Sequence, residues 1–506
     1  MNMPKDAHNA VEAPTKTREA VGVESELAEE ADAVQEKPQP VEAPKSRAFD
    51  VVVIGGGPGG YAAAVRVAEL GGRVLLVEKD DLGGAHVNRG GVSSKALLDS
   101  VNLLRWLENA EDFGVEVRHI RPLFDRMMRR QARLVRQWRA AWELFAGDHH
   151  VQVARGRARL VEPHVVEVEL RDGKVERFKA LSVIVATGSS PAPPPVPGGD
   201  GAGVLTSDNV WEMEELPSSL VVLGGGYVGV EFAYLFAQLG AQVALVEVLP
   251  RILATEDKDI SKEMTRLLEE SGVRLCLNAK VVGIADYEKQ KVVFFEGLNG
   301  PGEVVAAKVL AVAGRKPNIA HLGLEAVGVR IEAGRIMADD HLRTSVKGIY
   351  AVGDVLRGDG WAHLAAAEGI VAGENAMGGD RRIEREGVPR CLYTSPEIAS
   401  VGLTELQAQE QGRAIRTGLA RFRFNERALI AGEREGFVKV IVSEPTEQVI
   451  GVHIIGARAV DLVAAGVLTL KAGLTVNELL ATIHAHPSFV ETFFEAVKAT
   501  RHAHGL

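Results

Sequence analysis

The sequence has few cysteines, no surplus of positive charge and no long apolar run. Its 506 residues include two cysteines, Cys276 and Cys391, which excludes a disulfide scaffold and fits a reducing compartment. No uncharged apolar run reaches the ~18 residues that a membrane-spanning helix needs, and the N-terminus lacks the basic-then-apolar order of a secretory signal. The net charge of −10 argues against a protein that coats nucleic acid. We therefore expect a cytoplasmic protein without a membrane span or a nucleic-acid partner.

Glycine, in contrast, is abundant, with 54 residues and no collagen-like period, which indicates many tight turns. Residues 1–46 differ from the rest, because they hold ten acidic and five basic residues and no aromatic side chain. Such a segment cannot bury enough apolar surface to offset the entropy lost on ordering. We expect a disordered acidic tail that acts as a solvated leader; a docking arm for a partner is the alternative.

The folded part is predicted to open with a nucleotide-binding unit. Residues 50–54 form an apolar run typical of a buried parallel strand, followed by a helical pattern over 61–70 and a second strand over 73–78. The glycines between the first strand and the helix permit a tight turn, the approach of a pyrophosphate and close helix–strand packing. An acid at the end of the second strand can accept hydrogen bonds from a ribose. These cofactor-binding candidates are Gly55, Gly57, Gly60 and Glu78.

The same plan returns about a third of the chain later. Strands are predicted over 220–223 and 243–247 around a helix over 231–239, and the corresponding candidates are Gly224, Gly226, Gly229 and Glu247. A carboxylate at this position favours NAD over NADP, which would want an arginine; Arg251, four residues on, leaves the preference open. Two dinucleotide sites in one chain indicate an electron relay between a flavin and a nicotinamide.

Three further segments complete the organisation of the chain. Between 122 and 145, apolar residues recur at helical spacing opposite a row of arginines, which predicts a solvated helix face or, as the alternative, a site for an acidic partner. The proline-rich segment 190–199 predicts a linker. After residue 385, strands over 436–441 and 449–455 followed by helices indicate a separate α+β domain. We expect no metal site.

Taken with further motifs, these units resemble the flavoprotein disulfide reductases, most closely the dihydrolipoamide dehydrogenase branch, over about residues 48–500. The further motifs are ATG at 186–188, AGRKPN at 313–318, GIYAVGD at 348–354, YTSPE at 393–397 and HAHPSFVE at 484–491. The resemblance implies an α/β fold with two Rossmann-like dinucleotide-binding domains, for FAD and NAD, plus a C-terminal α+β dimerisation domain. It also implies a homodimer.

The domains expected from this resemblance follow one another along the chain. They are the acidic tail (1–46), the first part of the FAD-binding domain (47–190), the NAD-binding domain (191–312), a returning central domain (313–385) and the dimerisation domain (386–506). The resemblance implies that Asp354 binds the ribityl chain of the flavin and that Tyr227 can cover the nicotinamide pocket. The remaining implied cofactor-binding residues are Thr187, Gly188, Gly314, Arg315, Gly353 and Ala362.

One stretch departs from the family pattern. The family reads LGGTCxNxGCxPSK, with two cysteines that form a redox disulfide, whereas residues 82–95 of this chain read LGGAHVNRGGVSSK. By the resemblance, His86 stands in place of the thiol that exchanges with substrate and Gly91 in place of the thiol that touches the flavin. We expect His86 to fill space or to make a weak polar contact, with proton donation as the alternative. Gly91 is expected to open room for a flat acceptor.

Other parts of the family's machinery have counterparts in the sequence. Lys95 and Glu231 match the ion pair beside the flavin N5, and His486 and Glu491 match a base dyad that faces the partner subunit's flavin. Pro487 is expected to occupy the first position of a helix, with His486 just outside it. An incidental charge pair and a packed interface histidine are the respective alternatives.

These observations favour an FAD-dependent NADH oxidoreductase that passes electrons to a small non-thiol acceptor of the quinone or diaphorase type. Neither Cys276 nor Cys391 is expected to replace the missing disulfide, since both read as small buried hydrophobic residues. The alternatives are a catalytically silent FAD/NAD-binding subunit or sensor, and a component of a complex that resembles dihydrolipoamide dehydrogenase.

Overall fold

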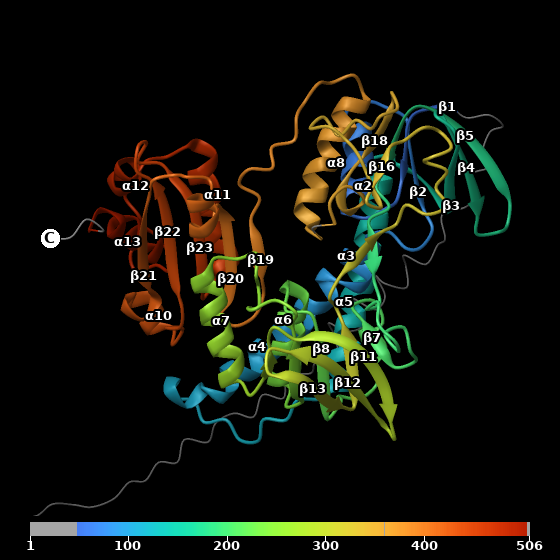
Figure 1. Cartoon of the computed structure of the whole chain (residues 1–506). Coiled ribbons are helices and arrows are strands. Elements are labelled where there is room, and N and C mark those ends of the chain that lie inside the picture. Colours follow the sequence, from blue (N-terminus) through green and yellow to red (C-terminus); the bar gives the residue numbers. More distant parts are fainter. Residues whose placement is uncertain (1–47, 359, 503–506) are drawn as a thin grey trace, which may run out of the picture. The chain divides into compact units, whose positions relative to one another are not determined.

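The computed structural model describes residues 48–358 and 360–502, so the predicted acidic tail lies outside the described residues. The first sheet is built around β1 (Ala48–Ile54), which pairs in parallel with β2 (Val74–Glu78) and with β5 (Val175–Val185) (Figure 1). Because both faces of this sheet are covered, the apolar run of β1 is buried along its length. Both predicted strands of this unit are confirmed.

Two elements extend this sheet. β18 (Ile349–Ala351), much later in the chain, pairs in parallel with β5. β3 (Gln152–Glu162) pairs in parallel with β2 and continues into an antiparallel ribbon with β4 (Val165–Leu170), which in turn pairs with β5. The returning segment therefore contributes a strand to the first sheet.

Helix α2 (Pro58–Glu69) follows β1 through a turn that only glycine can form. Gly55 has φ +107°, and a Cβ on Gly60 would lie 1.8 Å from the Gly55 carbonyl oxygen. Helix α8 (Ala362–Ala376) packs against α2, and a Cβ on Gly369 would lie 2.1 Å from the carbonyl oxygen of Gly59. The two helices thus meet backbone to backbone.

The second predicted unit is also confirmed. Its glycine turn leads into α6 (Tyr227–Gln238), which begins four residues earlier than predicted. A five-stranded parallel sheet carries the turn, in the order β10 (Arg274–Cys276), β9 (Gln242–Val246), β8 (Ser219–Leu223), β14 (Lys308–Ala311) and β7 (Val204–Thr206). An antiparallel sheet accompanies it, formed by β11 (Lys280–Tyr287), β12 (Gln290–Gly297) and β13 (Gly300–Ala306).

The predicted linker is not wholly irregular. Its first residues form β6 (Ser189–Pro191), which pairs antiparallel with β15 (Arg315–Pro317) of the returning segment. A small hairpin, β16 (Ile331–Glu332) with β17 (Arg335–Ile336), lies later in that segment. The outgoing and returning crossings between the first two sheets are therefore tied to each other.

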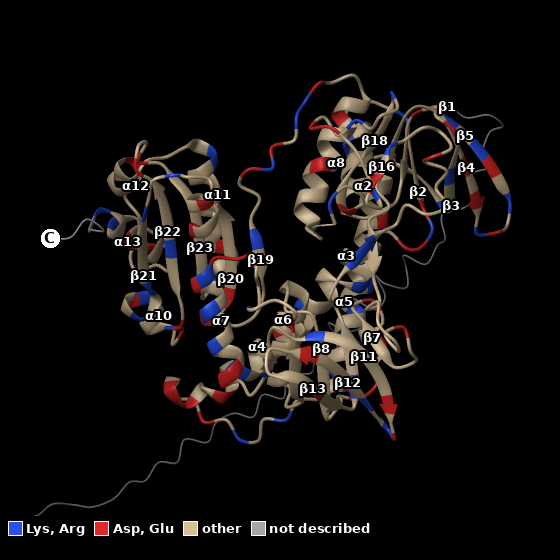
Figure 2. Cartoon of the chain, viewed as in Figure 1, with Lys and Arg blue, Asp and Glu red and all other residues tan. Residues whose placement is uncertain are grey.

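Three helices lie between β2 and β3: α3 (Gly84–Arg89), α4 (Gly91–Glu108) and α5 (Phe124–Asp148). The arginine face of α5 is only partly solvated, because Arg130 and Arg139 are half-buried. Figure 2 colours the basic residues of the chain blue. Arg130 donates to the Ala96 carbonyl on α4, and Arg139 donates to Asn88 on α3. The exposed arginines, as predicted, are Arg126, Arg129, Arg133 and Arg136.

The C-terminal part is the expected α+β unit (Figure 1). Its antiparallel sheet has the order β19 (Arg390–Leu392), β20 (Glu397–Gly402), β23 (Val449–Gly456), β22 (Phe437–Ser443) and β21 (Ile415–Arg421). Its helices are α9 (Glu405–Glu410), α10 (Glu426–Ile430), α11 (Ala459–Ala472), α12 (Val476–Ala481) and α13 (Glu491–Ala499). A buried cluster that includes Phe422, Val440 and Phe493 fills the space between sheet and helices.

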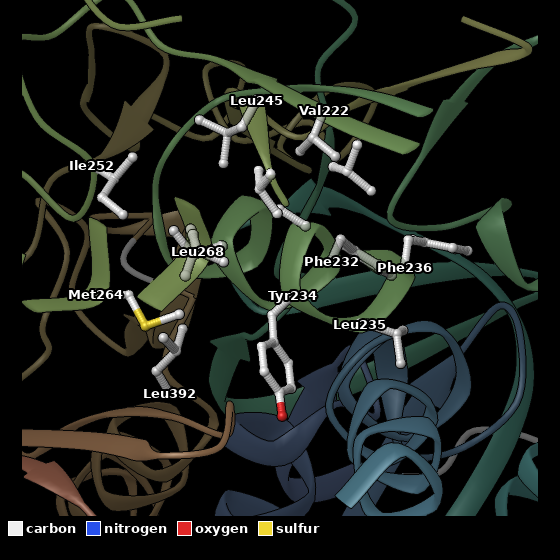
Figure 3. Packing of buried hydrophobic residues seen from close by; sticks show 14 of the residues in the cluster. Val222, Phe232, Tyr234, Leu235, Phe236, Leu245, Ile252, Met264, Leu268 and Leu392 are labelled. Atoms are coloured by element: carbon white, nitrogen blue, oxygen red, sulfur yellow. The ribbon is translucent and has the colours of Figure 1, made fainter. Parts of the chain in front are cut away.

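The largest core cluster surrounds α6 and joins several parts of the chain (Figure 3). Phe232, Leu235 and Phe236 of α6 are almost fully buried, and Met264 and Leu268 of α7 (Lys258–Glu270) face them. The same cluster includes residues from α4 and from the C-terminal sheet, namely Leu97, Leu98, Leu392, Ile398, Phe437 and Ile455. Continuous packing of this kind holds these elements in fixed relation to α6.

Candidate functional site

The glycine turn of the first unit forms an anion cradle at the start of α2. Gly57 is the N-cap, no side chain caps the free N–H groups of the first turn, and a Cβ on Gly57 would meet only the Gly84 Cα, at 3.8 Å. Glu78 accepts hydrogen bonds from the Gly56 N–H at 2.6 Å and from the Asp80 N–H at 2.8 Å. Its carboxylate is thereby fixed beside the cradle, where a dinucleotide ribose would need it.

The later flavin motif converges with residues 187–189, as the resemblance implied. The Ser189 hydroxyl bridges the two segments, because it donates to the Asp354 carboxylate and accepts from the Arg315 Nε at 2.7 Å. Thr187 donates to the Asn318 carbonyl at 2.7 Å. Sequence reasoning missed Ser189 and Asn318, although both stand inside or beside the quoted motifs.

Three further predicted residues lie at the same convergence of segments. Gly188 accepts from the Asn318 N–H at 2.9 Å, and nothing lies within 4 Å of a Cβ placed on Gly314. The Gly353 N–H donates to Glu368 on α8, the helix that Ala362 begins. Buried Glu368 is a third residue that sequence reasoning missed.

The second unit repeats the first in detail. Glu247 accepts from the Gly225 N–H and, at 2.8 Å, from the Leu249 N–H. Nothing lies within 4 Å of a Cβ placed on Gly226, so the start of α6 is open to a phosphate group. Arg251, the residue that left the NAD preference open, donates instead to the carbonyls of Ala254 and Glu256.

An ion pair joins the two units, where the resemblance implied one. The Lys95 Nζ on α4 lies 2.8 Å from both carboxylate oxygens of Glu231 on α6. The ammonium also sits 4.4 Å from the centre of the Tyr393 ring, and the Tyr393 N–H donates to Glu231 at 3.0 Å. Because Glu231 is 90% covered and Lys95 about two-thirds covered, the pair is held in one geometry.

The stretch that departs from the family pattern has a different geometry from the one expected. The helix is broken at Gly90, so His86 ends up on α3 and Gly91 begins α4. A Cβ on Gly91 would lie 2.4 Å from the His86 Nδ1, which means that the imidazole occupies the space beside the glycine. The expectation that His86 fills space is confirmed, and the expectation that Gly91 opens room for an acceptor is wrong.

The charge of His86 follows from its surroundings. Burial lowers the pKa of the imidazole, and the positive charge of Lys95 and the nearby His363 lower it further. His86 is therefore neutral near pH 7, which makes it a poor proton donor. Asn88 fixes the turn around it by donating to the carbonyls of Leu82 and Gly84, each at 3.0 Å.

The C-terminal dyad is formed within the chain. The His486 Nδ1 lies 2.9 Å from Glu491 Oε1, while the Ser488 N–H donates to the other oxygen at 2.7 Å. The hydrogen bond and the negative charge of Glu491 raise the pKa of His486, and Glu426 near the Nε2 adds to this. The predicted helix start is wrong, because α13 begins at Glu491 and residues 487–490 form a turn that presents the imidazole.

Neither thiol forms a redox centre with the other. Cys276 on β10 and Cys391 on β19 are both free, and burial raises the pKa of the Cys391 thiol to about 11. A thiol with such a pKa carries almost no thiolate at neutral pH, so Cys391 is a weak nucleophile. Within the described ranges, no group of three or more His, Cys, Asp or Glu side chains could hold a metal ion.

The sequence matches the family described as pyridine nucleotide-disulphide oxidoreductase over residues 49–369 and its dimerisation domain over residues 388–497. The chain belongs to this family. Dihydrolipoyl dehydrogenase of Bacillus subtilis is 37% identical over 463 residues, which cover 89% of this chain and 98% of the relative. Dihydrolipoyl dehydrogenase of Chlorobaculum tepidum is 37% identical over 451 residues, covering 88% and 96%.

Solved structures agree with this assignment to the pyridine nucleotide-disulphide oxidoreductases. LpdA from Mycobacterium tuberculosis superposes with a TM-score of 0.83 at 30% identity, covering 88% of this chain and 98% of that one. The HOCl-induced flavoprotein disulfide reductase RclA from Escherichia coli gives 0.80 at 27% identity, covering 89% and 99%. The predicted fold, two dinucleotide-binding parts and a dimerisation domain, is therefore confirmed.

This family consists of NAD(P)H-dependent flavoprotein oxidoreductases, and its dihydrolipoyl dehydrogenase members use FAD and NAD(H). The residues of the first unit fit FAD, since the start of α2 offers uncapped N–H donors, Glu78 is a fixed acceptor, and Asp354 follows β18 of the same sheet. The dimerisation domain supports a homodimer. In the part of the chain that is described, no helix has the length and apolar character that crossing a membrane requires.

Proposed function

We propose that this chain is an NADH-dependent flavoprotein that reduces a non-thiol acceptor, such as a quinone, and that it has no redox disulfide. The single observation that carries the proposal is the filling of the expected disulfide site by the imidazole of His86, packed against Gly91. Neither side chain can form a disulfide, and the two free cysteines lie on strands of other sheets.

The reaction consumes NADH, one proton and a quinone and yields NAD⁺ and the quinol. When bound, FAD supplies the means of accepting two electrons from NADH and passing them to the second acceptor. No side chain of the described site can carry electrons, so the protein's part is to bind, to orient and to provide a proton.

The residues of the chain divide these tasks. Glu247 holds the adenosine ribose of NADH, and its carboxylate disfavours the extra phosphate of NADPH. Lys95 and Glu231 place a paired charge where the two dinucleotide units meet. His486, oriented by Glu491, provides the proton to the acceptor from across the dimer, since its raised pKa keeps it charged at higher pH than an ordinary histidine.

The domain limits belong to the same proposal. We assign FAD binding to residues 47–190 with 313–385, NAD binding to 191–312 and dimerisation to 386–506. The sheet that β18 shares with β5 and the match of the dimerisation domain to residues 388–497 support these limits.

An anaerobic titration with NADH, followed by a panel of acceptors, tests the proposal. We expect NADH to bleach the flavin absorbance and the reduced protein to turn over quinones, with essentially no turnover of dihydrolipoamide or glutathione disulfide. No long-wavelength thiolate–flavin band should develop during the titration. Robust NAD-linked oxidation of dihydrolipoamide would overturn the proposal, and failure of NADH to bleach the flavin would favour a silent subunit.

A matched pair of variants sharpens the same test. The double variant His86→Cys/Gly91→Cys restores both thiols and removes the ring that would clash with a side chain at 91. We expect it to acquire the long-wavelength band on reduction, whereas His86→Cys alone should not. A double variant that forms a disulfide but gains neither band nor dithiol turnover would show that more than the two cysteines separates this chain from its relatives.

A further inference from the structure

A buried carboxylate contacts the turn that carries Asp354. Glu368 belongs to α8, and its side chain is 1% exposed. The Glu368 Oε2 accepts a hydrogen bond at 2.7 Å from the N–H of Gly353, the first residue of η3 (Gly353–Val355). Gly353 has φ +74°, in the left-handed region that favours glycine, so the chain turns sharply there. The hydrogen bond to Glu368 therefore fixes the first residue of the turn that contains Asp354.

Arg385 pairs with the same carboxylate. Its Nη2 and Nε donate to the Glu368 Oε1 at 3.0 and 3.2 Å, so each carboxylate oxygen has its own partner. Burial raises the pKa of Glu368, while the Gly353 N–H and the charge of Arg385 act against this rise. A buried carboxyl group costs free energy unless hydrogen bonds and a cation satisfy it. Glu368 therefore depends on the turn and on Arg385 together.

Arg385 belongs to the segment that leads into the dimerisation domain. This segment, residues 377–389, joins α8 to β19. Within it, the Ile383 N–H donates to the Asp340 carbonyl at 2.8 Å, and the Arg385 Nη1 donates to the Asp340 carboxylate at 3.2 Å. Asp340 lies between β17 and β18, directly upstream of the strand that η3 follows. The segment is therefore fastened to the first unit before it continues to β19.

We propose that Glu368 is a positioning residue for flavin binding and that Arg385 couples it to the segment that enters the dimerisation domain. The inference rests on the proposed function, in which the first unit binds FAD and Asp354 contacts it. The Asp354 carboxylate is oriented by the Ser189 hydroxyl and, at 3.1 Å, by the Gly360 N–H. These contacts orient the side chain, whereas Glu368 holds the backbone of the turn. Loss of the Glu368 contact loosens the turn, so that the flavin leaves before the chain unfolds.

Heating the FAD-loaded full chain tests the proposal without an acceptor or turnover. Flavin fluorescence reports flavin release, and far-UV circular dichroism reports unfolding of the same sample. In Glu368→Gln, the amide oxygen can accept from Gly353 or from Arg385, but the amide NH₂ cannot accept from the other. We expect flavin release at a fixed temperature to become about tenfold faster, the equivalent of one hydrogen bond to a charged group. The midpoint of release should fall further below the midpoint of unfolding than in the wild type.

Variants of the arginine and a matched control pair complete the experiment. Arg385→Gln leaves Glu368 without a cation and should also speed release about tenfold, whereas Arg385→Lys keeps the charge and should stay within about threefold of wild type. Glu374→Gln and Arg381→Gln are the controls. Glu374 lies on α8 as well and pairs with Arg66 and Arg381, none of which belongs to η3. These controls should leave the gap between the midpoints of release and unfolding unchanged.

The outcomes separate this inference from the proposed function. If release and unfolding stay unchanged or shift together in Glu368→Gln, Glu368 has no positioning role, although FAD remains the cofactor. An effect of Glu368→Gln without one of Arg385→Gln would overturn the coupling to the segment 377–389. If Glu368→Gln does not fold, the comparison of Arg385→Gln with Arg381→Gln still decides. Wild-type protein that purifies without flavin and binds no added FAD would overturn both the inference and the proposed function.

Discussion

The two glycine units share one backbone design but differ in what lies beside the start of the helix that follows each glycine turn. Both have a glycine turn at positive φ, a third glycine on which a Cβ would lie 1.8 Å from the carbonyl oxygen of the first, and a glutamate held by two backbone N–H groups. The start of α2 is packed against backbone, because Gly84 and the crossing helix α8 lie against it. The start of α6 is open, and one side chain lies beside it, that of Tyr227, whose hydroxyl donates to Glu256.

From this difference we infer that the two similar glycine motifs have different roles. Backbone packed against the start of α2 suits a cofactor that stays bound, whereas an open helix start with one hydrogen-bonded side chain beside it suits a nucleotide that enters and leaves. The glycine pattern alone cannot distinguish the two, since Gly84, α8 and Glu256 lie outside both motifs. The comparison also predicts that equal changes to the two units have unequal consequences.

The largest difference is expected from alanine at the third glycine of each unit. Gly60→Ala and Gly229→Ala each place a Cβ 1.8 Å from a carbonyl oxygen, so each must open its turn. We expect Gly60→Ala to lose the flavin on purification, and Gly229→Ala to keep it while flavin reduction by NADH slows at least about a hundredfold. Flavin content and stopped-flow bleaching measure the two effects. Gly147→Ala, with open space around it, is the control, and a yellow Gly60→Ala protein would contradict the prediction.

The ion pair between the units should give the next largest effect. Glu231→Gln keeps the shape of the side chain but leaves Lys95 with a neutral partner. Because paired charges placed at a reacting centre contribute one to three orders of magnitude, we expect flavin bleaching by NADH to slow about ten- to a hundredfold. Glu269→Gln, exposed on α7, is the matched control. An unchanged rate would make the pair a purely structural contact.

A smaller effect is expected at the two ribose-binding glutamates. Glu247→Gln should cost about tenfold in NADH affinity, because a charged acceptor becomes a neutral one, and it should narrow the preference over NADPH. Arg251 does not compensate, since carbonyls of its own loop hold it. Glu78→Gln is the counterpart in the first unit and should weaken flavin retention instead of NADH affinity. Equal affinity of the wild-type protein for NADH and NADPH would contradict this assignment.

The sequence was most informative where one motif determines one local geometry. The glycine turns, the strands on either side of them and the pair Lys95–Glu231 lie where the patterns placed them. The contacts of Tyr227 were not predicted, because Glu256, Arg390 and Trp361 come from three separate segments that only the fold brings together.

Local competition between residues explains the predictions that were wrong. Gly91 was expected to leave space, but a vacancy in a close-packed interior is filled by the nearest side chain, here His86. The start of α13 was misplaced, because Pro487 lies in a turn that precedes the helix, which begins at Glu491. Glu491 accepts from the Ser488 N–H and thereby joins this turn to the helix.

The smallest effect concerns the pH dependence of acceptor reduction through His486. Glu491 raises the pKa of this imidazole, so His486 keeps its proton to higher pH than an ordinary histidine. A rate that depends on protonated His486 is full below this pKa and falls as the pH rises through it. Glu491→Gln removes the raising charge, so the fall should move to lower pH, with a rate within about twofold of wild type at pH values below both pKa values.

Steady-state quinone reduction at saturating NADH between pH 5.5 and 9 measures this shift. Glu426→Gln is the graded control, because Glu426 lies 3.4 Å from the Nε2, beyond the 2.9 Å contact that Glu491 makes with the Nδ1, and it should move the profile less. The slope of the profile is diagnostic, since a base that had to be neutral would give a rate that rises with pH, although Glu491→Gln would shift that profile to lower pH as well. Superimposable profiles for wild type and Glu491→Gln would remove His486 from proton transfer and leave the dyad, 61% exposed at its imidazole, as a surface feature of the dimerisation domain.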